Sequence, residues 1–231
     1  MARKKAGKQK PESKIMYSLL FFGIIATLNI LFIYVVLAAT GFNQNSTTAQ
    51  VYLDILTSLS FPLSVILYLL ARGMSAKEMV AQIGLSKSGF NTKSLKYGIM
   101  LIGALLLFEF LVSAFSAATG ISLPTNVSAV FCGAPLYLLT YAVIGAPISE
   151  EILFRGFMVP RLGIIASAVI FAVLHLSYLS VSEFAAAFIF GLLAGYVFRK
   201  ARSIYPTIFA HMAINGISMV ALVLSGGLCL P

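Results

Sequence analysis

Seven long apolar segments constrain this chain more than any other feature of its sequence. A helix that crosses a bilayer needs about 20 predominantly apolar residues, with a tolerance of a few residues either way. Apolar residues make up 60% of the chain and charged residues 10%, whereas soluble domains average about 45–50% and about 25%. The sequence therefore predicts an all-α polytopic membrane bundle of about seven transmembrane helices. The predicted segments are residues 15–39, 53–71, 97–118, 129–158, 163–180, 184–199 and 205–225.

The basic residues predict how these segments are oriented. A net charge of +9 on a soluble protein would suggest a nucleic-acid partner. Here the charges lie in the N-terminal tail and in every second connection, which indicates a lipid bilayer as partner and no nucleic acid. Because cytoplasmic loops are rich in Lys and Arg, we expect a cytoplasmic N-terminus, a retained first span and an outer C-terminus. The basic connections carry Arg72, Lys77, Lys87, Lys93, Lys96, then Arg155, Arg161, then Arg199, Lys200 and Arg202.

The same pattern divides the chain into three parts. Residues 1–14 are predicted to form a basic cytoplasmic tail, and residues 15–128 the N-terminal membrane spans. Within these spans a cytoplasmic amphipathic loop is expected near 72–96, and its segment Ser75–Ile83 is either a short amphipathic helix or a solvated loop. Residues 129–225 are predicted to form a second membrane core, which holds the charged and polar residues described next.

Two smaller features concern packing. Gly191 and Gly195 form a GxxxG pattern that favours close helix packing. The two cysteines, Cys132 and Cys229, make no disulfide framework or CxxC metal knuckle, so we expect both to act as plain hydrophobic residues.

A run of charged residues in the fourth apolar segment demands a reason. A charge at the bilayer centre costs about 2.5–3.5 kcal/mol on insertion scales, and this segment holds Glu150, Glu151 and Arg155. Glu151 and Arg155 are four residues apart on a helix, so they are predicted to form an ion pair. Glu150 points about 100° away from its neighbour and is left without a local partner.

Both histidines of the chain also lie in apolar segments. His175 is in the fifth, and His211 with Asn215 is in the seventh, where the spacing of four puts them on one helix face. At about 1.5 Å per residue from the cytoplasmic ends, Glu150 lies about 12 Å deep, His175 about 18 Å, His211 about 9 Å and Asn215 about 15 Å. These depths predict one polar pocket open to the cytoplasm.

Such a pocket could hydrolyse a peptide bond. A carboxylate beside an imidazole can hold and deprotonate a water, while a second imidazole and an amide can donate hydrogen bonds to an oxyanion. No serine stands in a GxSxG context. Zinc held by Glu150, His175 and His211 is the alternative, although the HExxH spacing is absent.

Three motifs in this order resemble one known family. They are EExxxR (Glu150, Glu151, Arg155), FxxxH (Phe171, His175) and HxxxN (His211, Asn215). The chain resembles the CPBP family, which comprises type II CAAX prenyl endopeptidases and bacteriocin-processing or self-immunity (Abi) proteins.

The resemblance implies an intramembrane endopeptidase, often described as a metalloprotease, with a cavity open to the cytosol. It implies that Glu150 is the general base, that His175 helps to bind the water, and that His211 and Asn215 form the oxyanion site. Glu151, Arg155 and Phe171 would support them. The expected substrate is a membrane-associated protein or peptide, lipidated ones included, and the expected location is the plasma membrane of a prokaryote.

Two other function classes compete with a protease. A non-catalytic immunity or partner-binding protein would keep the polar cluster for stability. A proton-coupled transporter also uses buried Glu and His pairs, but it usually shows an internal repeat, and none is visible. Glu109, in the third segment, either lines the cavity or makes a structural hydrogen bond.

Overall fold

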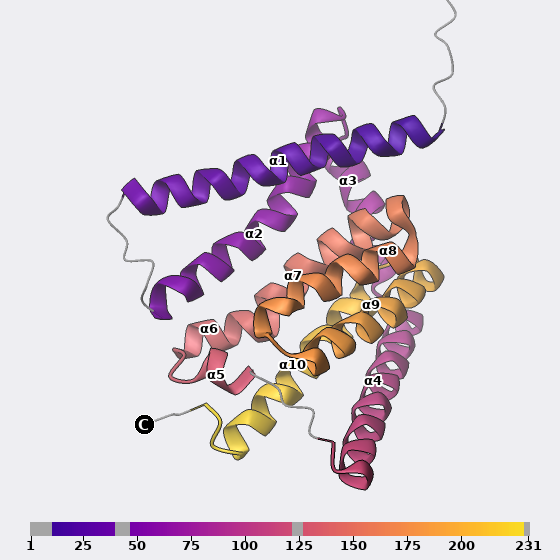
Figure 1. Cartoon of the computed structure of the whole chain (residues 1–231). Coiled ribbons are helices and arrows are strands. Elements are labelled where there is room, and N and C mark those ends of the chain that lie inside the picture. Colours follow the sequence, from indigo (N-terminus) through magenta and orange to yellow (C-terminus); the bar gives the residue numbers. More distant parts are fainter. Residues whose placement is uncertain (1–10, 40–46, 122–126, 229–231) are drawn as a thin grey trace, which may run out of the picture.

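The computed structural model is helical throughout the part it describes, residues 11–39, 47–121 and 127–228, and has no strand there (Figure 1). Most of the basic tail, residues 1–10, and Cys229 lie outside the described residues. The α-helices are α1 (Pro11–Ala39), α2 (Thr47–Ala71), α3 (Ala76–Ile83), α4 (Thr92–Thr119), α5 (Val127–Phe131), α6 (Leu136–Thr140), α7 (Ala146–Glu151), α8 (Val159–Leu174), α9 (Val181–Ala201) and α10 (Tyr205–Leu224). Short 3₁₀ turns and two π-helical segments connect some of them: η1 (Lys87–Gly89), η2 (Tyr141–Gly145), η3 (Ile152–Met158) and η4 (His175–Tyr178).

Four helical stretches in the described residues are long and apolar enough to cross a membrane. They are Thr92–Thr119, Leu136–Leu174, Val181–Ala201 and Tyr205–Leu224, and shorter apolar helices cover Leu19–Val35 and Ile55–Ala71. Large apolar side chains cover their outer faces; Phe110 is 66% exposed and Met100 67%. Because lipid is the solvent that such a surface fits, the chain is an integral membrane protein, as the composition predicts.

The long stretch Leu136–Leu174 is two rods and not one. Gly163 has φ 84° and ψ 175°, which breaks the helix, and glycine adopts this left-handed φ without the steric cost that a Cβ imposes. The break separates the predicted fourth and fifth segments. The predicted start of the fourth segment at 129 is wrong, because α5 ends at Phe131 and the rod begins at Leu136, after Gly133 (φ 69°) and Pro135.

One end of the bundle gathers the basic connections. The backbone N–H of Ile204 donates to Gly84 O over 3.1 Å, and the Tyr205 hydroxyl donates to Leu85 O over 2.9 Å. These bonds tie the α9–α10 turn to the segment after α3. We call this the basic end of the bundle.

Helix α3 confirms the helical interpretation of Ser75–Ile83. Ser75 caps its N-terminus in a capping box with Glu78, and hydrogen bonds from Ser75 lower the pKa of that exposed carboxyl group. Ile83 is buried and Met79 partly buried against the main core, while Lys77 is exposed. The helix is therefore amphipathic and lies flat against the bundle.

The opposite end carries a disulfide. Gly133 N donates to Leu228 O over 2.9 Å, which brings the segment before α6 against the end of the described chain. Cys132 is disulfide-bonded. The prediction that this cysteine is a plain hydrophobic residue is therefore wrong. The spacing of the sequence could not show that Gly133 and Leu228, which are 95 residues apart, meet at this end of the bundle.

Helices α8 and α9 pack at close range. A Cβ built on Gly191 would lie 2.8 Å from Ala168 Cβ and 2.9 Å from Ala168 Cα, and one on Gly195 would lie 2.9 Å from Ile164 Cγ2. The predicted packing role of GxxxG is confirmed.

Two π-helical segments flank the short helix that carries the glutamate pair. Segment η2 precedes α7 and segment η3 follows it. Such π turns occur often at functional sites. They widen the helix on both sides of Glu150 and Glu151, and so set the direction in which the two side chains point.

Candidate active site

A buried ion pair anchors the site. Arg155 Nη1 lies 2.7 Å from Glu151 Oε1, and the two side chains are 1% and 0% exposed. The guanidinium carbon lies 4.7 Å from the ring centroids of both Phe171 and Phe190. The predicted pair is therefore present, and the two aromatic faces add cation–π attraction to it.

His211 lies between the two glutamates. Its Nδ1 is 3.1 Å from Glu151 Oε1, and its Nε2 is 3.8 Å from Glu150 Oε2. Neighbouring glutamates diverge around the helix, yet the two nitrogens of one imidazole ring face opposite ways, so one ring can meet both. The structure thus brings Glu150 and His211 together, as the depth argument predicts.

The contact with Glu151 fixes which nitrogen of His211 carries a proton. A carboxylate that is paired with Arg155 can only accept a hydrogen bond, so Nδ1 must donate to it. Nε2 then faces Glu150, and a proton on the ring or on the carboxyl group makes that contact attractive. Glu150 Oε2 is buried and has no hydrogen-bond partner among the described residues.

His175 sits at the end of α8 and not within it. Helix α8 stops at Leu174, and the backbone N–H of His175 turns to Ala172 O and Val173 O. The His175 ring is hydrogen-bonded to the backbone carbonyl of Phe171, with Nδ1 2.9 Å from that oxygen. A carbonyl only accepts, so Nδ1 carries the proton and Nε2 of the neutral ring is an acceptor.

Phe171 explains the spacing in FxxxH. Its carbonyl receives His175, and its ring centroid lies 4.5 Å from the His175 ring and 5.9 Å from the His211 ring. The ring also lies under Arg155. Phe171 therefore holds both imidazoles and the guanidinium in place.

Asn215 reaches a different part of the site from His211. Its Nδ2 donates to Ala142 O over 2.9 Å. In segment η2 the N–H of Ala146 bonds Tyr141 O, five residues back, so the next carbonyl, Ala142, would need the N–H of residue 147. Residue 147 is Pro, which has none. The Asn215 amide replaces that missing donor and keeps one further hydrogen.

The residues do not fit a zinc site. No group of three or more His, Cys, Asp or Glu side chains in the described part of the chain could hold a metal ion. Glu150 and His211 approach each other, but no third His, Cys, Asp or Glu among the described residues completes a ligand group with them. We therefore derive no step through zinc.

One contact of the site was not predicted, and one of the two roles predicted for Glu109 is absent. Phe190 of α9 touches Arg155 and lies 4.5 Å from the His211 ring, yet nothing singles it out among 18 phenylalanines. Glu109 is exposed on α4 and makes no hydrogen bond within the described residues, so its predicted structural bond is absent.

The comparisons with known proteins agree with the motifs. The family model described as type II CAAX prenyl endopeptidase Rce1-like matches residues 132–217. No curated protein and no solved structure matches the chain. The matched region begins at Cys132, just before α6, and ends within α10. It contains every motif residue from Glu150 to Asn215. Over residues 132–217, the chain is therefore similar to the Rce1-like type II CAAX prenyl endopeptidases.

Proposed function

We propose that this protein is an endopeptidase that cleaves membrane-associated proteins or peptides, with Glu150 as the base that activates a water. The observation that carries the proposal is the environment of Glu150 Oε2. This buried oxygen lies 3.8 Å from His211 Nε2 and has no protein hydrogen bond among the described residues. A carboxylate oxygen left without a protein donor beside an imidazole suits proton transfer to or from a reacting molecule.

In the proposed reaction, Glu150 removes a proton from water as the water oxygen attacks the carbonyl carbon of the scissile peptide. His175 Nε2 accepts the second hydrogen of the water and orients it. The C–N bond then breaks, and the proton held by Glu150 passes to the leaving amine, which balances the charge and restores the carboxylate. No covalent enzyme intermediate forms.

His211 is the proposed donor to the oxyanion, assisted by the free hydrogen of Asn215. A donor at Nε2 requires an imidazolium, because Nδ1 already donates to Glu151. With His211 charged, two carboxylates face two cations, His211 and Arg155, and the buried cluster is neutral as a whole. Glu151 thus supports the site by accepting the Nδ1 hydrogen bond that orients His211, and Arg155 supports it by holding Glu151 in place.

The proposed orientation places the basic end of the bundle in the cytoplasm. Two features support it. The end with the disulfide of Cys132 suits an oxidising compartment, as on the outer side of a bacterial plasma membrane, and the Lys and Arg residues lie at the other end. With this orientation we expect the site to be reached from the cytoplasmic half of the bilayer, where a lipidated chain terminus would lie.

The test is cleavage of a farnesylated and of an unlipidated membrane-anchored reporter peptide by purified protein in liposomes. Glu150→Gln keeps the size of the side chain and removes the base, so we expect a loss of about 10²–10⁴-fold in kcat/KM. Glu109→Gln is the matched control, because Glu109 lies on α4 without a described hydrogen bond. Treatment with a zinc chelator should leave the rate unchanged.

Full cleavage by Glu150→Gln would remove the assigned base. If no reporter is cleaved but Glu150→Gln and His175→Ala retain a protective or partner-binding effect in cells, the non-catalytic alternative replaces the protease. Thermal unfolding of each variant in detergent distinguishes a lost reaction from a lost fold.

A further inference from the structure

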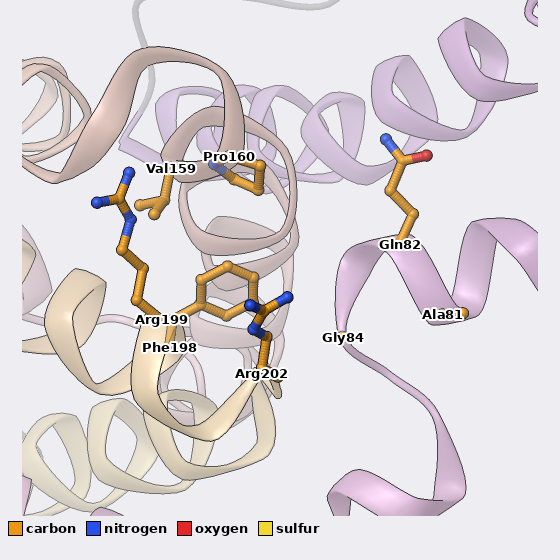
Figure 2. Close-up of a pocket in the computed structure, with 8 residues that line it drawn as sticks. All are labelled: Ala81, Gln82, Gly84, Val159, Pro160, Phe198, Arg199 and Arg202. Atoms are coloured by element: carbon orange, nitrogen blue, oxygen red, sulfur yellow. The ribbon is translucent and has the colours of Figure 1, made fainter.

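A cavity of about 540 Å³ opens at the basic end of the bundle, outside the cluster around Glu150. It lies between the C-terminal end of α3, the first residues of α8 and the last turn of α9 (Figure 2). Its lining residues are Ala81, Gln82, Gly84, Val159, Pro160, Phe198, Arg199 and Arg202.

The cavity carries positive charge that no acidic lining residue neutralises. Arg199 and Arg202 are both exposed, and neither guanidinium has an ion-pair or hydrogen-bond partner among the side chains that the structure describes. No acidic residue lines the cavity. Figure 2 shows both guanidinium groups on the α9 side, with the carboxamide of Gln82 on the α3 side. Cations that line a cavity without a carboxylate are stabilised by an anion that binds there.

The backbone at Arg202 points to a role for its side chain. Arg202 ends α9 with φ 54° and ψ 33°, in the left-handed region where glycine is the least strained residue. An arginine in this backbone conformation is strained. Among the described residues its guanidinium makes no hydrogen bond or ion pair that would offset the strain. Binding an external anion would offset it.

The walls of the cavity are fixed by close contacts. A Cβ on Gly84 would lie 3.1 Å from Phe198 Cε2 and 3.2 Å from Ile204 N, and Gly84 O accepts from that same N–H. The end of α3 and the end of α9 are therefore held at a set separation. Phe198 and Val159 are buried and give the cavity an apolar floor, whereas its rim carries the two arginines.

We propose that this cavity binds a phosphate group, and that the phosphate belongs to the headgroup of an anionic phospholipid. Arginine binds phosphate oxygens through two parallel N–H donors, and basic pockets between membrane helices on the cytoplasmic side suit anionic headgroups. The apolar floor beneath a basic rim favours a lipid over a free ion. The site is distinct from the proposed peptidase centre and does not depend on it.

The probes are phosphatidylglycerol, phosphatidylcholine and inorganic phosphate, each added to the full-length protein in neutral detergent. We expect phosphatidylglycerol, and not phosphatidylcholine, to raise the thermal unfolding temperature and to appear as one retained lipid in native mass spectra. The double variant Arg199→Gln/Arg202→Gln should weaken phosphatidylglycerol binding by about tenfold or more, because charge-assisted hydrogen bonds are lost.

Lys200→Gln is the matched control. It removes a cation from the same helical turn, but the Lys200 ammonium lies 5.5 Å from the Tyr196 ring centroid and does not line the cavity. We expect this variant to bind phosphatidylglycerol as the parent does. Arg199→Lys keeps the charge and the fold while losing the paired donors, and should show an intermediate affinity.

Two results would overturn the proposal. Equal phosphatidylglycerol binding by the parent and the double variant would show that the arginines do not form the site. Binding of inorganic phosphate that is lost in the double variant, with phosphatidylglycerol having no effect, would reject the lipid as its source.

Discussion

At the scale of single residues, the Asn215 amide compensates for a proline. The Ala142 carbonyl lacks a helical donor because residue 147 is Pro in a helix that has just passed through a π turn. Asn215 supplies the donor from α10. The bond joins the helix of His211 to the rod of Glu150, so Asn215 positions the two halves of the site in addition to its proposed role toward the oxyanion.

Asn215→Ala should therefore lower stability as well as activity. We expect a loss of about 1–3 kcal/mol in the free energy of unfolding, since a polar group is left unsatisfied in a low-dielectric site. Unfolding in detergent against increasing denaturant measures it. Pro147→Ala restores an N–H at residue 147, so the loss on Asn215→Ala should be smaller in the Pro147→Ala background. Equal losses in the two backgrounds would contradict this account.

The buried pair gives a second prediction. Arg155→Met leaves Glu151 buried with one cation fewer, and we expect a cost of about 3–5 kcal/mol in unfolding free energy. The double variant Glu151→Gln/Arg155→Met removes both charges and should be more stable than Arg155→Met alone. The comparison of the two unfolding curves tests whether the cost comes from an uncompensated charge. A double variant that is less stable than the single one would refute this.

The sequence predicted the ion pair within one helix and the approach of His211 to Glu150, but it missed other contacts between helices. The ion pair of Glu151 with Arg155 follows from a spacing of four. The bond between Glu151 and His211 joins residues 60 apart, and it depends on how α10 is rotated against α7, which no local pattern encodes. Phe190 was missed for the same reason.

At the scale of elements, the packing of α8 on α9 depends on the absence of a side chain. Gly191→Ala places a methyl group 2.9 Å from the backbone of Ala168, which cannot swing aside. We expect a loss of about 1–3 kcal/mol from overpacking, measured by thermal unfolding in detergent. Gly103→Ala is the control, because a Cβ there meets nothing within 4 Å on helix α4, and it should be neutral or stabilising.

The apolar segments were predicted well and their ends less well. Length and hydropathy located both ends of α1, α2, α4, α9 and α10 to within six residues. The break at Gly163 falls at the predicted boundary between the fourth and fifth segments, whereas the separate turn of α5 was not predicted. The 3₁₀ turn that begins at His175 was likewise hidden, since it preserves the apolar composition.

At the scale of the whole molecule, two chemical signals mark opposite ends of the bundle. The Lys and Arg connections share one end, and the disulfide of Cys132 lies at the other. Basic loops stay on the cytoplasmic side when a membrane protein is inserted, whereas disulfides form in an oxidising compartment outside the cytoplasm. Their separation is what a protein with a single fixed orientation requires.

This separation is tested by labelling in intact cells. We expect Cys132 to resist a membrane-impermeant maleimide until an impermeant reductant is added from outside, and then to react. A cysteine introduced at Ser88, at the basic end, should react only after the cells are opened. Labelling of Ser88→Cys in intact cells would reverse the proposed orientation.

The π turn before α7 carries one residue more than an α-helical turn would need. Deleting a single residue between 141 and 145 would let the rod close into an ordinary α-helix while the flanking apolar lengths stay almost unchanged. Because a π turn and the α-helical turn that replaces it cover nearly the same angle, the side chains beyond the deletion would keep their direction around the axis. A deletion between 146 and 149, where no widened turn takes up the change, would instead turn Glu150 by about 100° away from His211. The position of this carboxylate therefore depends on the length of the helix as well as on its sequence.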